Sequence, residues 1–380
     1  MTLIMAKHKI LIIHETMAGG GAERVLLDLL HHLNYTRFDV TLLLVYATGV
    51  YLDQLPGDVK LLYINKEKKR FIERLLFRCK PLLDRWQQHD INRLLGDERY
   101  DTIVSFMEGP AMVYHSFAAS RASRNVSWVH TDINTNHWSL PFHGSTLAEQ
   151  ARYALMDEVV FVSQGALDGF KAIFTNNSVH RVQHNPIDRN AIIAKAGQRQ
   201  VEKSRFTVCN VGRLIEVKRQ DRIVRAAAML KQRGVEVEFW IVGTGTLESQ
   251  LRELISKLQV QDTVKLLGFH DNPYPIINAA DAFLLTSDAE GYPTVVCEAL
   301  CLSKPIISTP VAGIDELLHD GTGIVCEPSD CAIADAVERL ATDREYCAHL
   351  AQASHLSGKQ FDINVVMQSI EEIFRGGFCC

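Results

Sequence analysis

Short apolar runs alternate with amphipathic and polar stretches along nearly the whole chain, and this alternation predicts repeated strand–helix units. In the first half, a Gly-rich loop leads from the first strand into an expected helix over residues 22–33. The apolar runs are rich in Val, Ile and Leu, which is typical of parallel strands covered by helices on both faces. The expected strands are residues 9–14, 38–46, 100–106, 125–130 and 158–163.

The same pattern restarts in the second half, where an expected helix over residues 221–233 follows the first strand. The change falls near Asn185-Pro186-Ile187-Asp188 and the polar segment 198–204, which we interpret as the linker. Two doubly wound α/β domains are therefore expected, and small-molecule sites favour the cleft between such domains. The expected strands of this half are residues 205–211, 237–242, 264–267, 282–285 and 305–308.

These patterns give three segments. We expect a first domain over residues 1–188, a second over 189–360, and a C-terminal segment over 361–380. The last helix, at 364–374, is expected to cross back over the first domain.

Length and composition agree with this division. At 380 residues the chain exceeds one ordinary core, and 47% apolar with 22% charged residues is typical of a soluble globular protein. A net charge of −5 gives no indication of a nucleic-acid partner, and no apolar run reaches the roughly 20 residues of a membrane span. Without a recognisable secretory leader, the nine cysteines are expected to be reduced thiols in a cytoplasmic protein.

Two carboxylates, Glu290 and Glu298, stand eight residues apart across a turn-like Gly-Tyr-Pro. The first follows an expected strand, and the second lies in the helix predicted by Val-Val-Cys-Glu-Ala-Leu. Ligands of open α/β sheets bind beyond the carboxyl ends of strands, where helix N-termini offer free N–H groups to anions. The pair could therefore grip sugar hydroxyls around a phosphate. Alternatively, it is a loop carboxylate and a helix-surface carboxylate in solvent.

Glycines and cations mark further loops after strands. Gly19-Gly20-Gly21 opens the first helix without the spacing of a dinucleotide fingerprint, so no nicotinamide cofactor is inferred. In the second half, Arg213 and Lys218 follow Gly212, where two cations could neutralise a diphosphate leaving group. An ordinary turn and ordinary surface cations are the respective alternatives.

Three weaker signals complete the set. Gly243 and Phe269 each follow or end a strand and could present groups to a flat base, or simply form βα turns. His130 at a strand end could bond a sugar hydroxyl, although a lone histidine is more often structural.

The order of these pieces resembles the retaining glycosyltransferases of family 4, which have the GT-B fold of two Rossmann-like domains facing across a deep cleft. The hinge variant Asn-Pro-Ile-Asp resembles members that build bacterial surface polysaccharide, lipopolysaccharide and lipid-linked glycans. The matching signatures are Gly19-Gly20-Gly21-Ala22-Glu23-Arg24, His130, Asn185-Pro186-Ile187-Asp188, Gly212-Arg213 with Lys218, Val242-Gly243-Thr244-Gly245, and Glu290 to Glu298.

The resemblance implies an acceptor-binding first domain and a donor-binding second domain. Arg213 and Lys218 would bind the diphosphate of a UDP-sugar, Glu298 the ribose and Glu290 the sugar. The remaining implied donor contacts are His130, the loop of Gly20 and Gly21, Gly212, Gly243, Phe269, and the backbone around Tyr292, Thr294 and Val295.

The resemblance also implies chemistry without a metal or other cofactor. A hexose or N-acetylhexosamine would pass to a glycan or polyprenyl-linked acceptor with retention, through same-face attack assisted by the leaving phosphate. Other possibilities are a UDP-sugar epimerase, a glycan phosphorylase, or a non-catalytic glycan-binding homologue.

Residues 66–86 carry eight Lys/Arg and three Asp/Glu, with apolar residues at helical spacing. A basic amphipathic helix can lie on an anionic membrane, here the inner face of the plasma membrane, or its apolar stripe can pack on the first domain. Both interpretations stay open.

Overall fold

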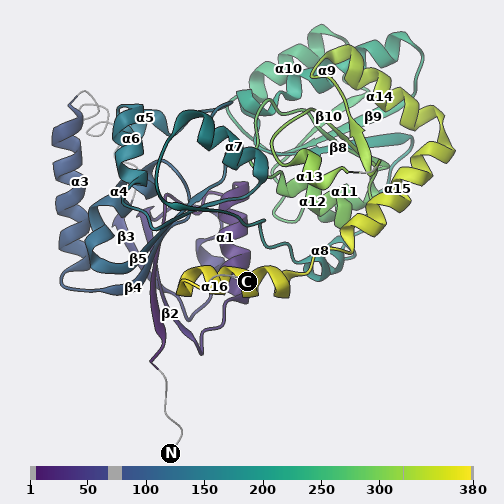
Figure 1. Cartoon of the computed structure of the whole chain (residues 1–380). Coiled ribbons are helices and arrows are strands. Elements are labelled where there is room, and N and C mark those ends of the chain that lie inside the picture. Colours follow the sequence, from purple (N-terminus) through teal and green to yellow (C-terminus); the bar gives the residue numbers. More distant parts are fainter. Residues whose placement is uncertain (1–5, 67–78, 320, 378–380) are drawn as a thin grey trace, which may run out of the picture. The chain divides into compact units, whose positions relative to one another are not determined.

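The structure, a computed structural model, describes residues 6–66, 79–319 and 321–377 (Figure 1). The chain divides into two compact units. Unit 1 is Met1–Pro186 with Asn364–Cys380, and unit 2 is Ile187–Ile363. Residues 198–204, which the sequence placed in the linker, lie inside unit 2 between its first helix and first strand.

Unit 1 is built on a seven-stranded parallel sheet in the order β3-β2-β1-β4-β5-β6-β7. Its central strands are buried because helices cover both faces, and Ile10 to Ile13 of β1 have no exposed surface. The strands are β1 His8–His14, β2 Phe38–Tyr46, β3 Lys60–Asn65, β4 Tyr100–Ser105, β5 Ala122–Val129, β6 Glu158–Phe161 and β7 Val179–Val182. The helices are α1 Gly21–His32, α3 Lys80–Leu95, α4 Pro110–Ala118, α5 Leu140–His143, α6 Thr146–Tyr153, α7 Gln164–Ile173 and α16 Ile363–Arg375, with short 3₁₀ turns η1 Leu52–Gln54 and η2 Ala119–Arg121.

The last helix, α16, completes the core of unit 1 although it is distant in sequence. Met367, Ile370 and Phe374 recur at helical spacing and are buried. The Phe374 ring packs edge-on against Trp128 at 5.9 Å, and the hydroxyl of Thr102 donates a 2.6 Å hydrogen bond to the Phe374 carbonyl. Burial of one such aromatic side chain stabilises a fold by about 2–3 kcal/mol.

Unit 2 repeats the architecture with a six-stranded parallel sheet in the order β10-β9-β8-β11-β12-β13. Its strands are β8 Phe206–Val211, β9 Val237–Val242, β10 Val264–Gly268, β11 Ala282–Leu285, β12 Ile306–Ser308 and β13 Gly323–Val325. The helices are α8 Arg189–Ala196, α9 Gln220–Gln232, α10 Glu248–Lys257, α11 Tyr274–Ala279, α12 Thr294–Cys301, α13 Ile314–Leu317, α14 Asp330–Thr342 and α15 Arg344–Gly358, with the 3₁₀ turn η3 Glu216–Lys218.

Both sheets reverse their strand order around the first strand, which confirms the predicted α/β class with two doubly wound parallel sheets. In unit 1 the chain moves outward from β1 to β2 and β3, then returns to the other side with β4. In unit 2, β8 holds the same position between β9 and β11. We call the carboxyl ends of β1 and β4, and those of β8 and β11, the two switch points, because ligands of such sheets bind there.

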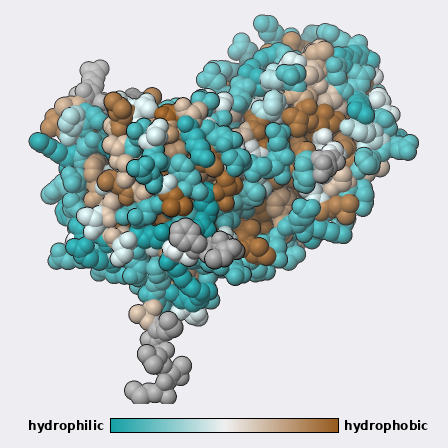
Figure 2. All heavy atoms as spheres, in the orientation of Figure 1, coloured by the Kyte–Doolittle hydropathy of each residue, from teal (hydrophilic) through white to brown (hydrophobic). Residues whose placement is uncertain are grey.

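The segment predicted as basic and amphipathic is described only in part, since residues 67–78 lie outside the described residues. Its C-terminal part opens α3, where Pro81 occupies the first turn, a position at which proline is favourable. Within the described ranges, no helix combines the length and apolar character needed to cross a bilayer. Hydrophilic side chains cover most of the face shown in Figure 2.

Candidate functional site

The switch point of unit 2 gathers most of the residues singled out by the sequence. The loop after β8 and the loop after β11 are joined by backbone and side-chain hydrogen bonds. The N–H of Asp288 donates to the carbonyl of Val217 at 2.8 Å, and the Thr286 hydroxyl donates to the carbonyl of Lys218 at 2.9 Å. These bonds fix the backbone from which Lys218 and Glu290 project.

Lys218 and Glu290 form a direct ion pair at this point. The Lys218 Nζ lies 2.6 Å from Glu290 Oε1, and the two side chains are 22% and 13% exposed. The Ser287 hydroxyl donates a second 2.6 Å hydrogen bond to the same carboxylate oxygen. The resemblance implied separate roles for these residues, and the structure places their charged atoms in contact.

A second ion cluster beside the pair was not predicted. The carboxylate of Asp288 receives Arg219 at 2.9 Å and Arg222 at 2.6 Å, and Arg222 also donates to the Thr286 carbonyl. Hydrogen bonds to Asp221 and Asp288 raise the pKa of Arg219, whose backbone is left-handed with φ 49°. Because Arg219 and Arg222 are already paired with carboxylates, we infer that they hold the loops after β8 and β11 together.

Arg213 differs from these arginines. It is exposed, and no described side chain pairs with its guanidinium. Its backbone is held by Gln220, whose amide donates to the Arg213 carbonyl at 3.0 Å. A cation on a fixed backbone with a free guanidinium is suited to bind an anion.

Gly243 is needed for a reason that the sequence did not show. Its φ is +138°, and a Cβ there would lie 2.0 Å from the Gly212 carbonyl oxygen. Gly243 therefore lets the loops after β8 and β9 pass at close range, in line with the 2.9 Å bond from Gly212 N–H to the Val242 carbonyl. Phe269, just after β10, is 49% exposed.

Helix α12 starts at the same switch point. Thr294 and Val295 are its first two residues, whose N–H groups have no acceptor within the helix. Glu298 lies one turn further on, and its Oε1 accepts a 3.1 Å hydrogen bond from the Tyr274 hydroxyl. Tyr292, just before the helix, is buried, which raises the pKa of its phenol. The Tyr274 contact is a positioning feature that sequence spacing could not reveal.

In unit 1, His130 follows β5, and its position depends on a buried acid that the sequence analysis missed. The carboxylate of Glu108, only 1% exposed, accepts the His130 backbone N–H and the Trp138 indole N–H, each at 2.9 Å. Glu108 follows β4 in Phe-Met-Glu-Gly, so a lone acid directly after a buried strand was the available signal.

A second histidine, His14 at the end of β1, also lies at the switch point of unit 1. The Phe106 ring lies 6.3 Å from His14 and 4.9 Å from His130. Burial lowers the pKa of both imidazoles, that of His130 to about 3, so both are neutral near pH 7. Both ring nitrogens of His14 and the Nε2 of His130 are buried without a described hydrogen-bond partner. Neutral imidazoles can donate to and accept from hydroxyls.

The Gly-rich loop of unit 1 places Gly20 at the N-cap of α1 and Gly21 at its first position. The N-cap residue Gly20 supplies no side-chain cap, and the Glu23 carboxylate lies close to Gly20 at this helix start. Over residues 6–66, 79–319 and 321–377, no group of three or more His, Cys, Asp or Glu side chains is arranged to hold a metal ion.

Solved structures with this architecture define the class. The chain matches the crystal structure of Anabaena HepE in complex with UDP and glucose with a TM-score of 0.77 and 22% identity, over 96% of this chain and 99% of that one. The chain therefore has the GT-B fold of glycosyltransferases, with two Rossmann-like domains.

The sequence of unit 2 resembles known glycosyltransferases. The family model "Glycosyl transferases group 1" matches residues 193–356, which lie within unit 2. An alpha-D-kanosaminyltransferase from Streptomyces kanamyceticus is 30% identical over 54% of the chain, which covers 56% of that relative's length. An uncharacterized glycosyltransferase from Haemophilus influenzae is 21% identical over 92% of this chain and 95% of its own.

Proposed function

We propose that this chain is a retaining glycosyltransferase that moves a hexose or N-acetylhexosamine from a UDP-sugar to a glycan or lipid-linked acceptor, in the synthesis of bacterial polysaccharide or glycoconjugates. The match of residues 193–356 to the glycosyl transferases group 1 model supports glycosyl transfer. The observation that carries the finer proposal is the Lys218–Glu290 contact at the switch point of unit 2. In a UDP-sugar the phosphate is bonded directly to the sugar. A cation for the phosphate, Lys218, and a carboxylate for a sugar hydroxyl, Glu290, must therefore lie side by side, as they do here.

The diphosphate is bound by Arg213, Lys218 and the start of α12. Arg213 offers an exposed guanidinium that pairs with no described side chain. Lys218 has three N–H donors, of which Glu290 needs one. The N–H groups of Thr294 and Val295, with the positive end of the helix dipole, add donors for the phosphate oxygens.

The sugar and nucleoside are bound by the two carboxylates and the neighbouring loops. Glu290 accepts from a donor-sugar hydroxyl while Lys218 contacts the adjacent phosphate. Glu298 accepts from the ribose hydroxyls, with Tyr274 orienting its other oxygen. The exposed ring of Phe269 and the backbone near Gly243 lie after neighbouring strands, where they can contact the base.

The reaction breaks the bond between the anomeric carbon and the phosphate oxygen and forms one to the acceptor oxygen on the same face. The electron pair of the broken bond goes to the diphosphate, and the acceptor proton is transferred to a phosphate oxygen. Arg213 and Lys218 offset the charge that develops on the leaving group. His130, as a neutral imidazole, bonds a sugar hydroxyl rather than acting as an acid. No metal ion or other cofactor is needed in this scheme.

Under this proposal the protein is a cytoplasmic enzyme. A lipid-linked acceptor would bring it to the anionic inner face of the plasma membrane. The excess of Lys and Arg over residues 66–86 supports this partner. Within the described part, Lys80 is engaged by Asp84, so the earlier cations would make the contact. Reversing the charges of Lys68, Lys69, Arg70 and Arg74 is expected to abolish binding to anionic liposomes. Unchanged binding would contradict the membrane partner.

A thermal-shift screen of UDP-, GDP- and ADP-sugars tests the donor proposal. We expect a UDP-sugar to give the largest stabilisation, and Arg213→Ala and Glu298→Ala each to abolish it. Arg252→Ala is the matched control, because Arg252 is an exposed arginine on α10 whose one partner among the described residues is Glu248. Failure of every nucleotide-sugar to stabilise the wild-type chain would favour a non-catalytic homologue instead.

Analysis of the product tests separately whether the configuration of the anomeric carbon is retained. Proton NMR of the product formed from an α-linked UDP-sugar is expected to show an α-linkage. A β-linked product would contradict the same-face mechanism while leaving the donor proposal intact.

A further inference from the structure

Unit 2 contains a cavity at the edge of its sheet opposite to the switch point. The residues around it begin strands instead of following them: Phe206 opens β8, Asp281 precedes β11, and Lys304 precedes β12. Helices α14 and α15 close the other side. Because β8 alone is six residues long, the two edges are about 20 Å apart. The cavity is therefore separate from the proposed donor site.

The cavity has the size of a small-molecule site. Its volume is about 660 Å³, within the range of roughly 300–1,000 Å³ typical of ligand pockets. One wall is apolar, made by the ring of Phe206 with small and aliphatic side chains of the two helices. The apolar helix residues are Leu340, Ala341, Ala348 and Ala351.

The charges around this cavity are mostly positive, in a chain whose net charge is −5. Lys203, Arg205, Lys304 and Arg344 line it, and Asp281 is its single carboxylate. That carboxylate is already engaged, since it pairs with Lys203 and accepts the Thr207 backbone N–H at 2.8 Å.

Lys304 is the most enclosed of these cations, and burial lowers the pKa of its ammonium. Its Nζ donates to the carbonyls of Asn278 and Ala280, the latter at 3.0 Å, and it forms no ion pair within the described residues. An ammonium has three donors, so one remains for a ligand. A half-buried cation held only by carbonyl dipoles favours a nearby anion.

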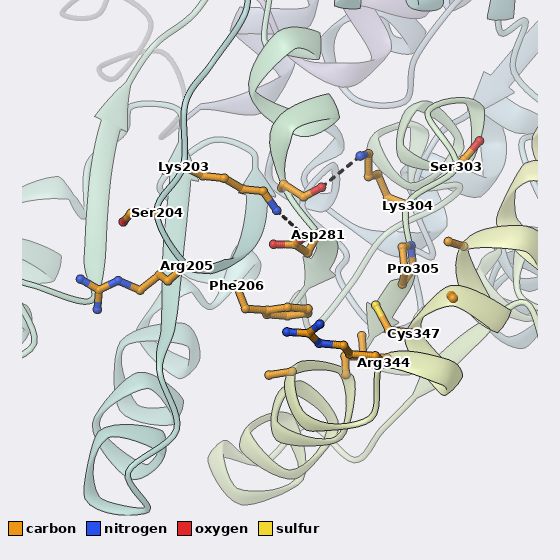
Figure 3. A pocket seen from close by; sticks show the side chains of 15 residues that line it. Lys203, Ser204, Arg205, Phe206, Asp281, Ser303, Lys304, Pro305, Arg344 and Cys347 are labelled. Atoms are coloured by element: carbon orange, nitrogen blue, oxygen red, sulfur yellow. Dashed lines mark hydrogen bonds and ion pairs between the residues drawn. The ribbon is translucent and has the colours of Figure 1, made fainter.

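The arginines differ in direction (Figure 3). Arg344, the first residue of α15, lies beside the Phe206 ring in this view, whereas the guanidinium of Arg205 extends away from the other labelled side chains. The pKa of the Asp262 carboxyl is held below its usual value by Lys231 and, more weakly, by Arg205. The charge of Arg205 therefore acts on Asp262, which does not line the cavity, in agreement with the outward direction of its side chain. The cations available to a ligand are therefore Lys203, Lys304 and Arg344.

We propose that this cavity is a second binding site of unit 2, for a small molecule that carries a phosphate and an aromatic or apolar portion. The phosphate is bound by Lys304 and Arg344, with Lys203 at the rim, and the organic portion packs on Phe206 and the helix wall. This site goes beyond the proposed transferase and does not depend on it.

The cavity also touches the element that carries Glu298. Ser303 and Lys304 directly follow α12, and the Ser303 hydroxyl bonds His355 of α15 at 3.0 Å. A ligand in this cavity would contact the residues that follow the C-terminal end of α12. The N-terminal end of the same helix lies at the switch point of unit 2.

Isothermal titration of the full chain with phenyl phosphate and with inorganic phosphate tests the proposal. All variants carry Arg213→Ala, which weakens anion binding at the switch point. We expect phenyl phosphate to bind about tenfold more tightly than inorganic phosphate, since burying a phenyl ring favours binding by at least that factor. Equal affinities, or no binding of phenyl phosphate at millimolar concentration, would contradict the proposal.

Paired arginine variants locate the site. Arg344→Gln is expected to weaken phenyl phosphate binding about tenfold, as loss of a charge-assisted hydrogen bond does. Arg205→Gln, which removes the same charge from an outward-pointing side chain, is expected to change it less than twofold. Lys304→Gln should match Arg344→Gln if the variant folds. Equal losses from Arg205→Gln and Arg344→Gln would indicate diffuse electrostatic attraction and overturn the site.

Discussion

The two switch points have the same topology and opposite chemistry. In unit 2, the point between β8 and β11 carries ion pairs, an exposed arginine and a helix start. In unit 1, the point between β1 and β4 carries two neutral imidazoles and a buried acid that fixes one of them. A shared strand order therefore fixes where a ligand binds, while the side chains in the loops decide whether it is an anion or a neutral hydroxyl compound.

The largest expected effect comes from the charged switch point. Glu290→Gln removes the carboxylate that contacts Lys218 and the proposed sugar hydroxyl. We expect kcat for sugar transfer to fall by about 10²–10³, the usual effect of losing one preorganised polar group at a reacting centre. Radiolabelled transfer from the UDP-sugar identified by the screen measures it. Glu248→Gln, which breaks an exposed pair on α10, should leave kcat unchanged.

The second largest effect is expected from Glu108, the buried acid of unit 1. Glu108→Ala leaves the N–H groups of His130 and Trp138 without their acceptor, and should lower the free energy of unfolding by about 3 kcal/mol. Urea denaturation measures this loss. Since UDP binds in unit 2 under our proposal, stabilisation by UDP should persist, while kcat for transfer should fall because His130 loses the group that fixes it. Glu108→Gln, which keeps one acceptor oxygen, should lie between wild type and Glu108→Ala.

Acid should affect unit 1 through its buried histidines. Burial lowers the pKa of His115 to about 4, while the unfolded side chain titrates near 6.5. The unfolded chain therefore binds the proton first, and stability falls as pH drops below about 6.5 until about pH 4. For His115 alone the loss at pH 5 is about 2 kcal/mol.

Amide hydrogen exchange at pH 7 and pH 5, corrected for the intrinsic rates, measures this effect in each unit. Protection should decrease in β4, β5 and α4 around His115, and His115→Gln should reduce this decrease, with the remainder due to the other buried histidines of unit 1. His115→Gln with an unchanged pH dependence would show that another group is responsible.

The smallest expected effect is that of metal removal. Arg213, Lys218 and the start of α12 supply the positive charge opposite the diphosphate, so chelation by EDTA should leave the transfer rate within about twofold. Loss of activity on chelation, with recovery on adding Mg²⁺ or Mn²⁺, would show that the proposed cations are insufficient.

The sequence predicted the central strands well because buried parallel strands are continuous apolar runs. Strands β2, β9 and β11 match their expected bounds. The edge strands β3, β7 and β13 were missed, whereas the edge strand β10 was predicted. The missed strands are largely exposed and have no continuous buried apolar run: β7 and β13 are short, and β3 exposes Leu61 and Tyr63. Edge strands are recognised by their pairing, which a local pattern does not contain.

The same limit applies to the candidate site. Lys218 and Glu290 follow adjacent strands, so their place at one sheet edge was predictable, but their 2.6 Å contact depends on loop conformation. The contacts of Glu108 and the Tyr274–Glu298 bond join segments that are distant in sequence, so sequence spacing could not predict them. The neutral state of His14 is an effect of burial, which the sequence pattern also does not contain. Gly243 shows a related limit, because close packing against Gly212 accounts for it without a ligand.

The most direct test of the central claim compares UDP with the UDP-sugar in the Glu290→Gln variant by isothermal titration. If Glu290 binds the sugar and Lys218 the diphosphate, the variant should bind UDP as well as wild type, or more tightly because Lys218 is released from its ion pair. Its affinity for the UDP-sugar should fall about tenfold. Equal losses for both ligands would contradict the assignment of Glu290 to the sugar.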